Sequence, residues 1–570
     1  MGGGTAGLTV ATRLSQYLPD SSVLVIEAGP DARDVPGIYI PRLSGSTLGS
    51  IYDWNFTTVP QQHASDRVIP QNRGHVLGGS SALNLLSYDR GAKADYDAWQ
   101  ELGNPGWDWA SMHAAMRKAE TYQVTSSPGS EAIAEEGGVG MNGPIHALVN
   151  RFNPPQQQQF FPTMQNLGLE QTASFLDGDM LGWMYHTSMI FESNYTRSYS
   201  PDYLSRAGPN LRVMTGTMVA RIEIDDNHCA TGVTLADGST LRAKKEVILS
   251  AGSIQSPQLL ELSGIGNPSI LSSAGVTPVV DLTGVGENLQ DHMRISTAYQ
   301  LKDNYTSPDE LRLNATFAAE QMALYEQGEL SWYDETSSGY AYMQWPQAGE
   351  DQARFVDLAE QSVDPSSSVD KVKLDHLRDL SKRVPQVEIL FSDGYLGGKG
   401  YPVQNSSLYG KRFFALIASV NHPFSRGSTH INSSDVMDHP LFDPNYLSTP
   451  YDLHAITAAA RQLRRIATTP PLSYAWVSEY EPGFDVVSTE QEWAEYARLN
   501  FSTIWHPLGT CAMLPKEDGG VVSPELKVYG VDRLRVVDAS VVPILVSGHI
   551  QTSAYGIAER AAEMIAREWE

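Results

Sequence analysis

Apolar positions at the start of the chain predict a helix followed by a buried strand. From Leu8 to Leu18, apolar residues recur at the three- and four-residue spacing of a helix that buries one face. The run VLVIEAG, residues 23–29, is apolar without alternation, which is typical of a parallel strand buried on both faces and here ends in Glu27. A Gly-rich loop that opens such a helix normally follows a strand, and here only Met1 precedes it. We therefore expect the first strand of this unit to be missing from the sequence.

The same pattern predicts alternating helices and short strands elsewhere, apart from one irregular stretch. Residues 300–480 are aromatic and show little periodicity, and the acidic segment 350–370 is typical of a solvated surface excursion. The remaining predictions are helices at 93–103, 110–122, 253–266, 450–467, 555–568 and near 310–326, and short strands between 211 and 250 and at 533–543.

Length and composition bound the class of protein. A chain of 570 residues with 41% hydrophobic residues is globular and too long for one core, so we expect at least two lobes. The net charge of −26 argues against nucleic-acid and membrane partners, because such a surface repels phosphate and anionic lipid. Cys229 and Cys511 are too few for a disulfide framework or a zinc cluster, although one bridge between them stays open. No metal-ligand spacing is present, so no metal is predicted.

Seven glycosylation sequons suggest a secretory history, with a cytoplasmic location as the alternative. No signal-peptide pattern is visible, and we therefore expect the amino terminus of the sequence to be incomplete. The sequons begin at Asn55, Asn194, Asn304, Asn314, Asn405, Asn432 and Asn500.

The loop from Gly2 to Gly7 has the glycine spacing of a dinucleotide-binding motif, G-x-G-x-x-G. Glycines let backbone approach a pyrophosphate, and the N-terminus of the following helix attracts its negative charge. The carboxylate of Glu27 suits the two ribose hydroxyls of an adenosine and repels a 2′-phosphate, which disfavours NADP. The loop by itself leaves NAD and FAD open.

Five further blocks, in order along the chain, resemble the glucose–methanol–choline (GMC) oxidoreductases, a family of FAD enzymes. His75 is a departure, because the family usually carries Arg or Lys there. The blocks are RGHVLGGSSALNLLSYDRGAKADYDAW (73–99), GSIQSPQLLELSGIG (252–266), GVGENLQDH (284–292), WHPLGTCAM (505–513) and VVDASVVP (536–543), the last before IAERAAEMI.

This resemblance implies an α/β fold in two parts. A Rossmann-like FAD-binding domain is expected from residues 1–60, 200–295 and 505–570, without its first strand. A second α+β domain, an antiparallel sheet with helices, is expected to bind substrate and to comprise residues 61–199 and 296–504.

The resemblance also implies the site residues and the cofactor, FAD. His506 is expected to act as the catalytic base and His549 as hydrogen-bond partner of the alcohol oxygen. The expected cofactor contacts are Gly2, Gly4, Thr5, Ala6, Gly7, Glu27, Ala28, Gly79, Ser80, Asn84, Leu85, Leu86, Ser87, Val219, Asp538, Ala539, Ile550 and Gln551.

The implied activity is oxidation of an alcohol to an aldehyde, ketone or lactone, by hydride transfer to flavin N5. A neutral imidazole near its ordinary pKa of about 6.5 would take the hydroxyl proton. The partners are thus a small-molecule alcohol and an electron acceptor, oxygen or another; the oligomeric state is not predicted.

Three alternatives stay open: an FAD-containing lyase of the hydroxynitrile lyase type, a silent flavoprotein and, weakest, an NAD-dependent dehydrogenase. Trp332, Tyr333, Tyr340 and Tyr342 fit a core better than the lining of an aryl-alcohol pocket.

Overall fold

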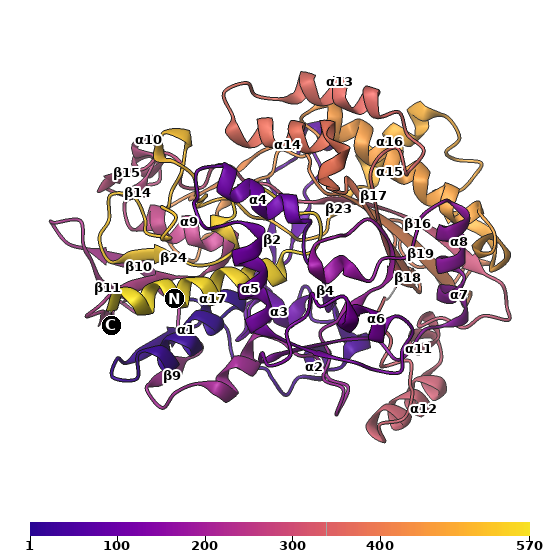
Figure 1. Cartoon of the computed structure of the whole chain (residues 1–570), viewed down its shortest axis with the longest axis horizontal. Helices are drawn as coiled ribbons and strands as arrows, with labels where there is room; N and C mark the ends of the chain where they lie inside the picture. Colours follow the sequence, from indigo (N-terminus) through magenta and orange to yellow (C-terminus); the bar gives the residue numbers. More distant parts are fainter. Residues whose placement is uncertain (338, 570) are drawn as a thin grey trace.

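The computed structural model describes residues 1–337 and 339–569 (Figure 1). It confirms the predicted α/β class, with short parallel strand pairs and one large antiparallel sheet. The opening pattern is also confirmed, since helix α1 spans Thr5–Tyr17 and strand β1 spans Val23–Ile26.

Two short parallel pairs meet at the first residues of the chain. Strand β1 pairs with β9 (Leu211–Met214), and β13 (Val247–Leu249) pairs with β24 (Leu534–Val536). Between them, the Gly2 amide donates to the Ile26 carbonyl at 2.8 Å, and the Met1 ammonium donates to the Ile248 carbonyl at 2.7 Å. The glycine loop thus lies at the carboxyl ends of parallel strands, where ligands of open α/β sheets bind.

Helices from distant parts of the sequence cover these strands. Helix α1 packs against the terminal helix α17 (Gln551–Trp569), which also packs against α5 (Trp109–Ala119), as seen at the left of Figure 1. Arg13 of α1 and Glu559 of α17 form an ion pair of 2.8 Å in which the glutamate is fully buried. Helix α9 (Gly252–Leu262) follows β13, and α4 (Lys93–Glu101) precedes α5, both as predicted.

The residue pattern predicted an irregular stretch at 300–480, and that prediction is wrong. The stretch supplies most of the antiparallel sheet that the family resemblance implied for the second domain. The strands run in the order β22-β16-β19-β18-β17-β7, and β23 (Ser502–Thr503) also pairs with β16. Every residue of β19 is buried, so the alternation that marks a half-exposed strand is absent from its sequence. The bounds are β22 (Trp476–Glu481), β16 (Met293–Leu301), β19 (Phe413–Val420), β18 (Val387–Asp393), β17 (Gly339–Met343) and β7 (Gly182–Tyr185).

The acidic segment 350–370 is also not the expected surface excursion. It forms helix α13 (Gln352–Ser362) and the start of α14 (Ser368–Arg378), and α13 packs on α15 (Pro450–Thr468). Phe355, Leu358 and Ala359 are buried at helical spacing, whereas Asp357 and Glu360 of the same helix are exposed. The many charged residues of this segment made the apolar face of α13 hard to recognise in the sequence.

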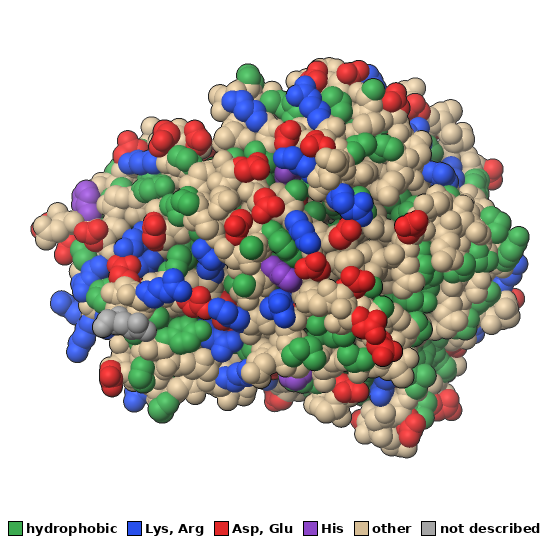
Figure 2. Space-filling view, viewed as in Figure 1, with side chains coloured by type: hydrophobic (Ala, Val, Ile, Leu, Met, Phe, Trp, Pro, Cys, Tyr) green, Lys and Arg blue, Asp and Glu red, His purple; other side chains and the backbone are tan. Residues whose placement is uncertain are grey.

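The described surface and thiols add three observations. Figure 2 shows acidic and basic side chains interspersed on one face rather than gathered by sign. Cys229 and Cys511 are both free, so the bridge left open above is not formed. Among the described residues, helices of the length and apolarity needed to cross a membrane are absent.

Candidate active site

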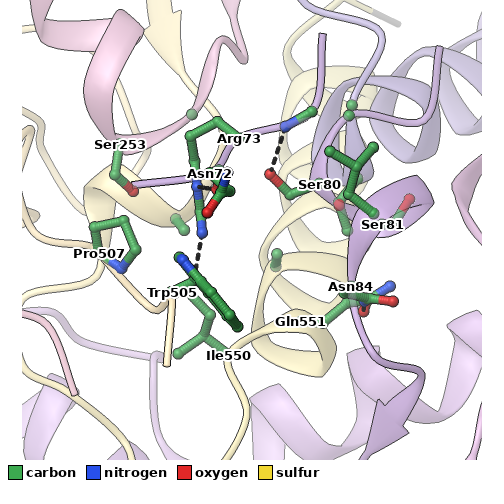
Figure 3. Close-up of a pocket in the computed structure, with 18 of the residues that line it drawn as sticks. Asn72, Arg73, Ser80, Ser81, Asn84, Ser253, Trp505, Pro507, Ile550 and Gln551 are labelled. Carbon is green, nitrogen blue, oxygen red and sulfur yellow. Dashed lines mark hydrogen bonds between the residues drawn. The ribbon is translucent and has the colours of Figure 1, made fainter. Parts of the chain in front are cut away.

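One long cavity runs from the glycine loop to the two carboxyl-terminal histidines. Figure 3 shows part of its lining, to which residues around 72–84, 253, 505–507 and 550–551 contribute from separate parts of the chain. Of the predicted site residues, those that line it are Gly2, Gly4, Thr5, Ala6, Glu27, Ala28, Gly79, Ser80, Asn84, Leu85, Ser87, Val219, His506, Asp538, Ala539, His549, Ile550 and Gln551.

Gly7 and Leu86 lie behind this lining rather than in it. A Cβ atom on Gly7 would sit 1.9 Å from the Gly2 carbonyl oxygen, so this glycine lets the helix pack closely on its own loop. The Leu86 side chain is fully buried in an apolar cluster. The structure therefore gives both residues a packing role.

The loop end of the cavity is built mainly from backbone. A Cβ on Gly79 would lie 2.8 Å from the Gly4 Cα, so the two glycine segments touch. The amides of Gly3 and Gly29 donate to the Glu27 carboxylate at 2.7 and 2.8 Å. Burial raises the pKa of Glu27 to about 7, against the lowering effect of these amides.

The same end fits a dinucleotide on physical grounds. Helix α1 directs its N-terminus at the cavity, and its first residues, Thr5 and Ala6, line the cavity without a charged side chain among them. The buried Oγ of Ser250, another lining residue, has no hydrogen-bond partner within the described chain. Asp538 is already engaged, because the Gly252 amide and Ser256 Oγ donate to its carboxylate at 2.9 and 2.6 Å.

At the other end of the cavity, hydrogen bonds among lining residues hold the segment before His506 and the start of helix α17. Arg73 donates to the Trp505 carbonyl at 2.6 Å, as the dashed line in Figure 3 shows, and Asn84 donates to the side chain of Gln551. Trp505 adopts φ of +63°, a left-handed conformation that is uncommon outside glycine. The backbone thus turns sharply immediately before the histidine.

His506 is buried, and its ring contacts another imidazole rather than a carboxylate. Its backbone amide donates to Asp291 Oδ1 at 2.8 Å, and its Nδ1 is 2.9 Å from Nδ1 of His292. Burial, followed by the nearby charge of His549, lowers the pKa of His506 well below its usual value. The expectation of an unperturbed pKa is therefore wrong, and the reason is that the ring is only 8% exposed.

His549 lies instead against two carboxyl groups. Its Nδ1 is 2.9 Å from Asp89 Oδ2 and 3.7 Å from Glu388 Oε1, and its backbone amide also donates to Asp89 at 2.9 Å. Burial opposes the charged form, but Asp89 and Glu388 together raise the pKa of His549 to about 9. His549 is thus an imidazolium at neutral pH.

The two imidazoles lie next to one another in the cavity lining, packed edge to face. Their ring centroids are 5.1 Å apart with the planes at 81°. Each ring uses Nδ1 on a buried partner, so the nitrogen that remains for the cavity is Nε2 in both. Nε2 of the cationic His549 and Nε2 of the neutral His506 are therefore both available in the same part of the cavity.

The sequence analysis missed three residues that shape this end. Asp89 belongs to the block 73–99 and His292 to the block 284–292. Nothing in these blocks indicated that Asp89 contacts His549 or that His292 contacts His506. Glu388 lies on β18, outside every block, so nothing in the sequence signalled it. Tyr342 Oη lies 2.7 Å from an oxygen of both Asp89 and Glu388 and so links the two carboxyl groups, although its single proton can be donated to only one of them.

The four aromatic residues considered for the pocket divide. Trp332, Tyr333 and Tyr342 are buried and do not line the cavity, whereas Tyr340 lines it and shares a hydrogen bond of 2.6 Å with Ser87. The core interpretation thus describes three of the four positions, and Tyr340 reaches the cavity from β17.

Two described groups have the spacing of metal ligands: Asp89 with His186 and His549, and Asp95 with His376 and His422. In the first group, His186 Nε2 and His549 Nδ1 each lie 2.9 Å from Asp89 Oδ2, and an N–H···O hydrogen bond from each ring explains these distances. That the protein needs no metal stays a prediction.

Comparison with known proteins identifies the family. Family models described as GMC oxidoreductase match residues 1–294 and 423–558, so the chain belongs to the GMC oxidoreductase family. It is 35% identical to the GMC oxidoreductase family protein Mala s 12 of Malassezia sympodialis, over 99% of this chain and 91% of that protein.

Two solved structures extend this likeness to the whole fold. An FAD-dependent oxidoreductase from Chaetomium thermophilum superposes with a TM-score of 0.88 at 30% identity, covering 100% of this chain and 98% of the other. A fungal aryl-alcohol oxidase superposes with a TM-score of 0.84 at 28% identity, covering 100% and 98%. The protein is an FAD-dependent oxidoreductase that acts on CH–OH donors.

Proposed function

We propose that this enzyme oxidises a small alcohol to the aldehyde, ketone or lactone, with His506 accepting the hydroxyl proton and His549 binding the alcohol oxygen. FAD, when bound, supplies the acceptor for the hydride at N5, and oxygen or another acceptor then takes the electrons. The protein's own contribution is to bind, orient and move one proton.

The residues that would hold FAD divide by type of contact. The backbone of Gly2, Gly4, Thr5 and Ala6 suits the pyrophosphate, and Glu27 suits the ribose. The other proposed contacts are Ala28, Gly79, Ser80, Asn84, Leu85, Ser87, Val219, Asp538, Ala539, Ile550 and Gln551, with Gly7 and Leu86 behind them.

The observation that carries the proposal is the difference in what the paired histidines contact: Nδ1 of His549 lies 2.9 Å from an Asp89 carboxylate oxygen, and Nδ1 of His506 lies 2.9 Å from the His292 ring. The cationic His549 can donate from Nε2 to the alcohol oxygen, while the neutral His506 can accept the hydroxyl proton. The low pKa keeps His506 ready to accept throughout the neutral range.

The cavity wall supports an apolar alcohol as substrate. Apolar side chains from the antiparallel sheet, from the loop after β18 and from the segment before Trp505 line it, namely Tyr340, Leu390, Leu396, Ile417 and Ile504. Likeness to the aryl-alcohol oxidase supports the same class. We expect aryl and aliphatic primary alcohols to be better substrates than sugars.

The test is anaerobic mixing of the FAD-loaded enzyme with aryl, aliphatic and sugar alcohols. An oxidoreductase loses its yellow flavin colour, and readmission of oxygen with peroxide assay then separates an oxidase from a dehydrogenase. A lyase, the alternative reading, would convert a cyanohydrin while the flavin stays yellow. That result would refute the proposal.

Two further predictions accompany this function. The family resemblance predicts a division into two domains. Residues 1–60, 200–295 and 505–570 form the first, and residues 61–199 and 296–504 form the second.

That the protein is a secreted glycoprotein is supported by six exposed sequon asparagines, while Asn500 is half-buried. Protein isolated from its natural source should therefore lose mass on treatment with an endoglycosidase.

A further inference from the structure

The block GVGENLQDH ends in two residues that lie directly behind His506. Asp291 accepts hydrogen bonds from the His506 amide at 2.8 Å and from Thr503 Oγ1 at 2.6 Å. His292 is 1% exposed and contacts the His506 ring itself. The pair thus holds both the backbone and the side chain of the proposed base.

The contacts of His292 leave only one assignment of protons. Its Nε2 lies 2.8 Å from the carbonyl oxygen of Asn421, and a carbonyl oxygen only accepts, so Nε2 carries hydrogen. Burial lowers the pKa of His292 to about 3, so the neutral ring has no second proton. Its Nδ1 is therefore an acceptor.

The same reasoning assigns the position of the proton on the His506 ring. The two Nδ1 atoms are 2.9 Å apart, and since His292 accepts, His506 Nδ1 must donate. His506 is neutral and has a single proton, now placed on Nδ1. The lone pair of its Nε2 is left for the cavity, where the proposed mechanism requires an acceptor.

We propose that His292 is a positioning residue that sets the tautomer of His506, through the chain Asn421 carbonyl, His292, His506. This inference rests on the proposed role of His506 as proton acceptor. Without a partner on Nδ1, either nitrogen of His506 can carry the proton. The tautomer with hydrogen on Nε2 would offer the alcohol a donor instead of an acceptor and would be inactive.

Two substitutions of His292 separate this role from simple packing. In His292→Asn the side-chain oxygen lies near the position of Nδ1 and can still accept from His506. In His292→Leu no polar atom remains. His113→Leu is the matched control, because His113 Nε2 is likewise hydrogen-bonded to a carbonyl, that of Gly138 at 3.0 Å, and does not line the cavity.

The measurements use the FAD-loaded full chain. We expect His292→Leu to reduce kcat by about 10²–10³-fold, within the range of general-base catalysis, with FAD content unchanged and KM within about threefold. His292→Asn should retain kcat to within about tenfold, and His113→Leu should behave as the unmodified enzyme. Equal losses in the Asn and Leu variants, or no loss in either, would overturn the inference.

A spectroscopic readout is independent of turnover. In protein labelled with ¹⁵N-histidine, the His506 signals are those lost in His506→Ala, and the unmodified enzyme should show Nδ1 protonated and Nε2 bare. A bare Nδ1 would refute the tautomer assignment, even if a variant fails to fold. If His506→Ala instead keeps full turnover, the proposed function fails while the tautomer result stands.

Discussion

The two ends of the cavity are built from different materials. The loop end uses backbone, with Gly4 and Gly79 in contact and the N-terminus of α1 aimed inward. The histidine end uses side chains whose charge is set by what lies behind them: a neutral imidazole behind His506 and a carboxylate behind His549. One side-chain type thus takes two protonation states, and cofactor binding should be separable from turnover.

The largest effect should come from His506→Ala. Removal of the acceptor should lower the rate of flavin bleaching by about 10²–10⁴-fold, because general-base catalysis contributes that much. FAD content should not change, since FAD is held mainly at the other end. Stopped-flow absorbance measures the rate of flavin bleaching, and the ratio of flavin to protein absorbance measures the FAD content. A colourless variant would show that cofactor binding and turnover are not separable in this way.

The converse substitution is Gly79→Ala. Its Cβ would meet the Gly4 Cα at 2.8 Å and force the two glycine segments apart, so we expect FAD affinity to fall by about 10–100-fold, or about 1.4–2.8 kcal/mol. Fluorescence titration of the apoprotein with FAD measures it.

Gly238→Ala is the control for that experiment. Gly238 also has positive φ, +85°, but its Cβ would meet nothing within 4 Å. It shares the backbone strain without the clash. Similar losses of FAD in both variants would show that strain, not close approach, explains the effect.

Asp89→Asn should sharpen the contrast between the histidines. In the unmodified enzyme kcat/KM should hold across neutral pH and fall as pH rises through about 9, where His549 loses its proton. Loss of the anion at 2.9 Å should lower that limb by about 1–3 pH units. A pH profile measures it, and an unmoved limb would contradict the assignment of His549 as donor.

The pKa of His549 is raised on folding, and this has a consequence for stability. The pair with Asp89 stabilises the fold fully below the ordinary histidine pKa of about 6.5 and loses that contribution as pH rises to about 9. The Tm of the unmodified enzyme should therefore fall more steeply over this window than that of Asp89→Asn.

The smallest effect is expected from Glu388→Gln. Its carboxyl oxygen is 3.7 Å from His549 Nδ1, and burial raises its own pKa to about 7, so it is only partly charged at neutral pH. The alkaline limb should move down by less than about one unit. A shift larger than that of Asp89→Asn would reverse the ranking of the two carboxyl groups.

Local patterns predicted much of the loop end, because its parts are close in sequence. The spacing of Gly2, Gly4 and Gly7, the helix after them and the strand to Glu27 each follow from propensities over a few residues. The residue pattern did not mark the strands of the large antiparallel sheet, which only the family resemblance led us to expect. Its strands, such as β19, are apolar on both faces and carry no period to detect.

The residues alone identified the family and the cofactor and pointed to two histidines as candidates for the chemistry, since ordered motif blocks carry that information. What only the folded chain decided was how those histidines differ. His506 meets His292 from 214 residues away, and His549 meets Asp89 from 460. Protonation depends on burial and on charges a few ångströms away in space, and the linear order of residues contains neither.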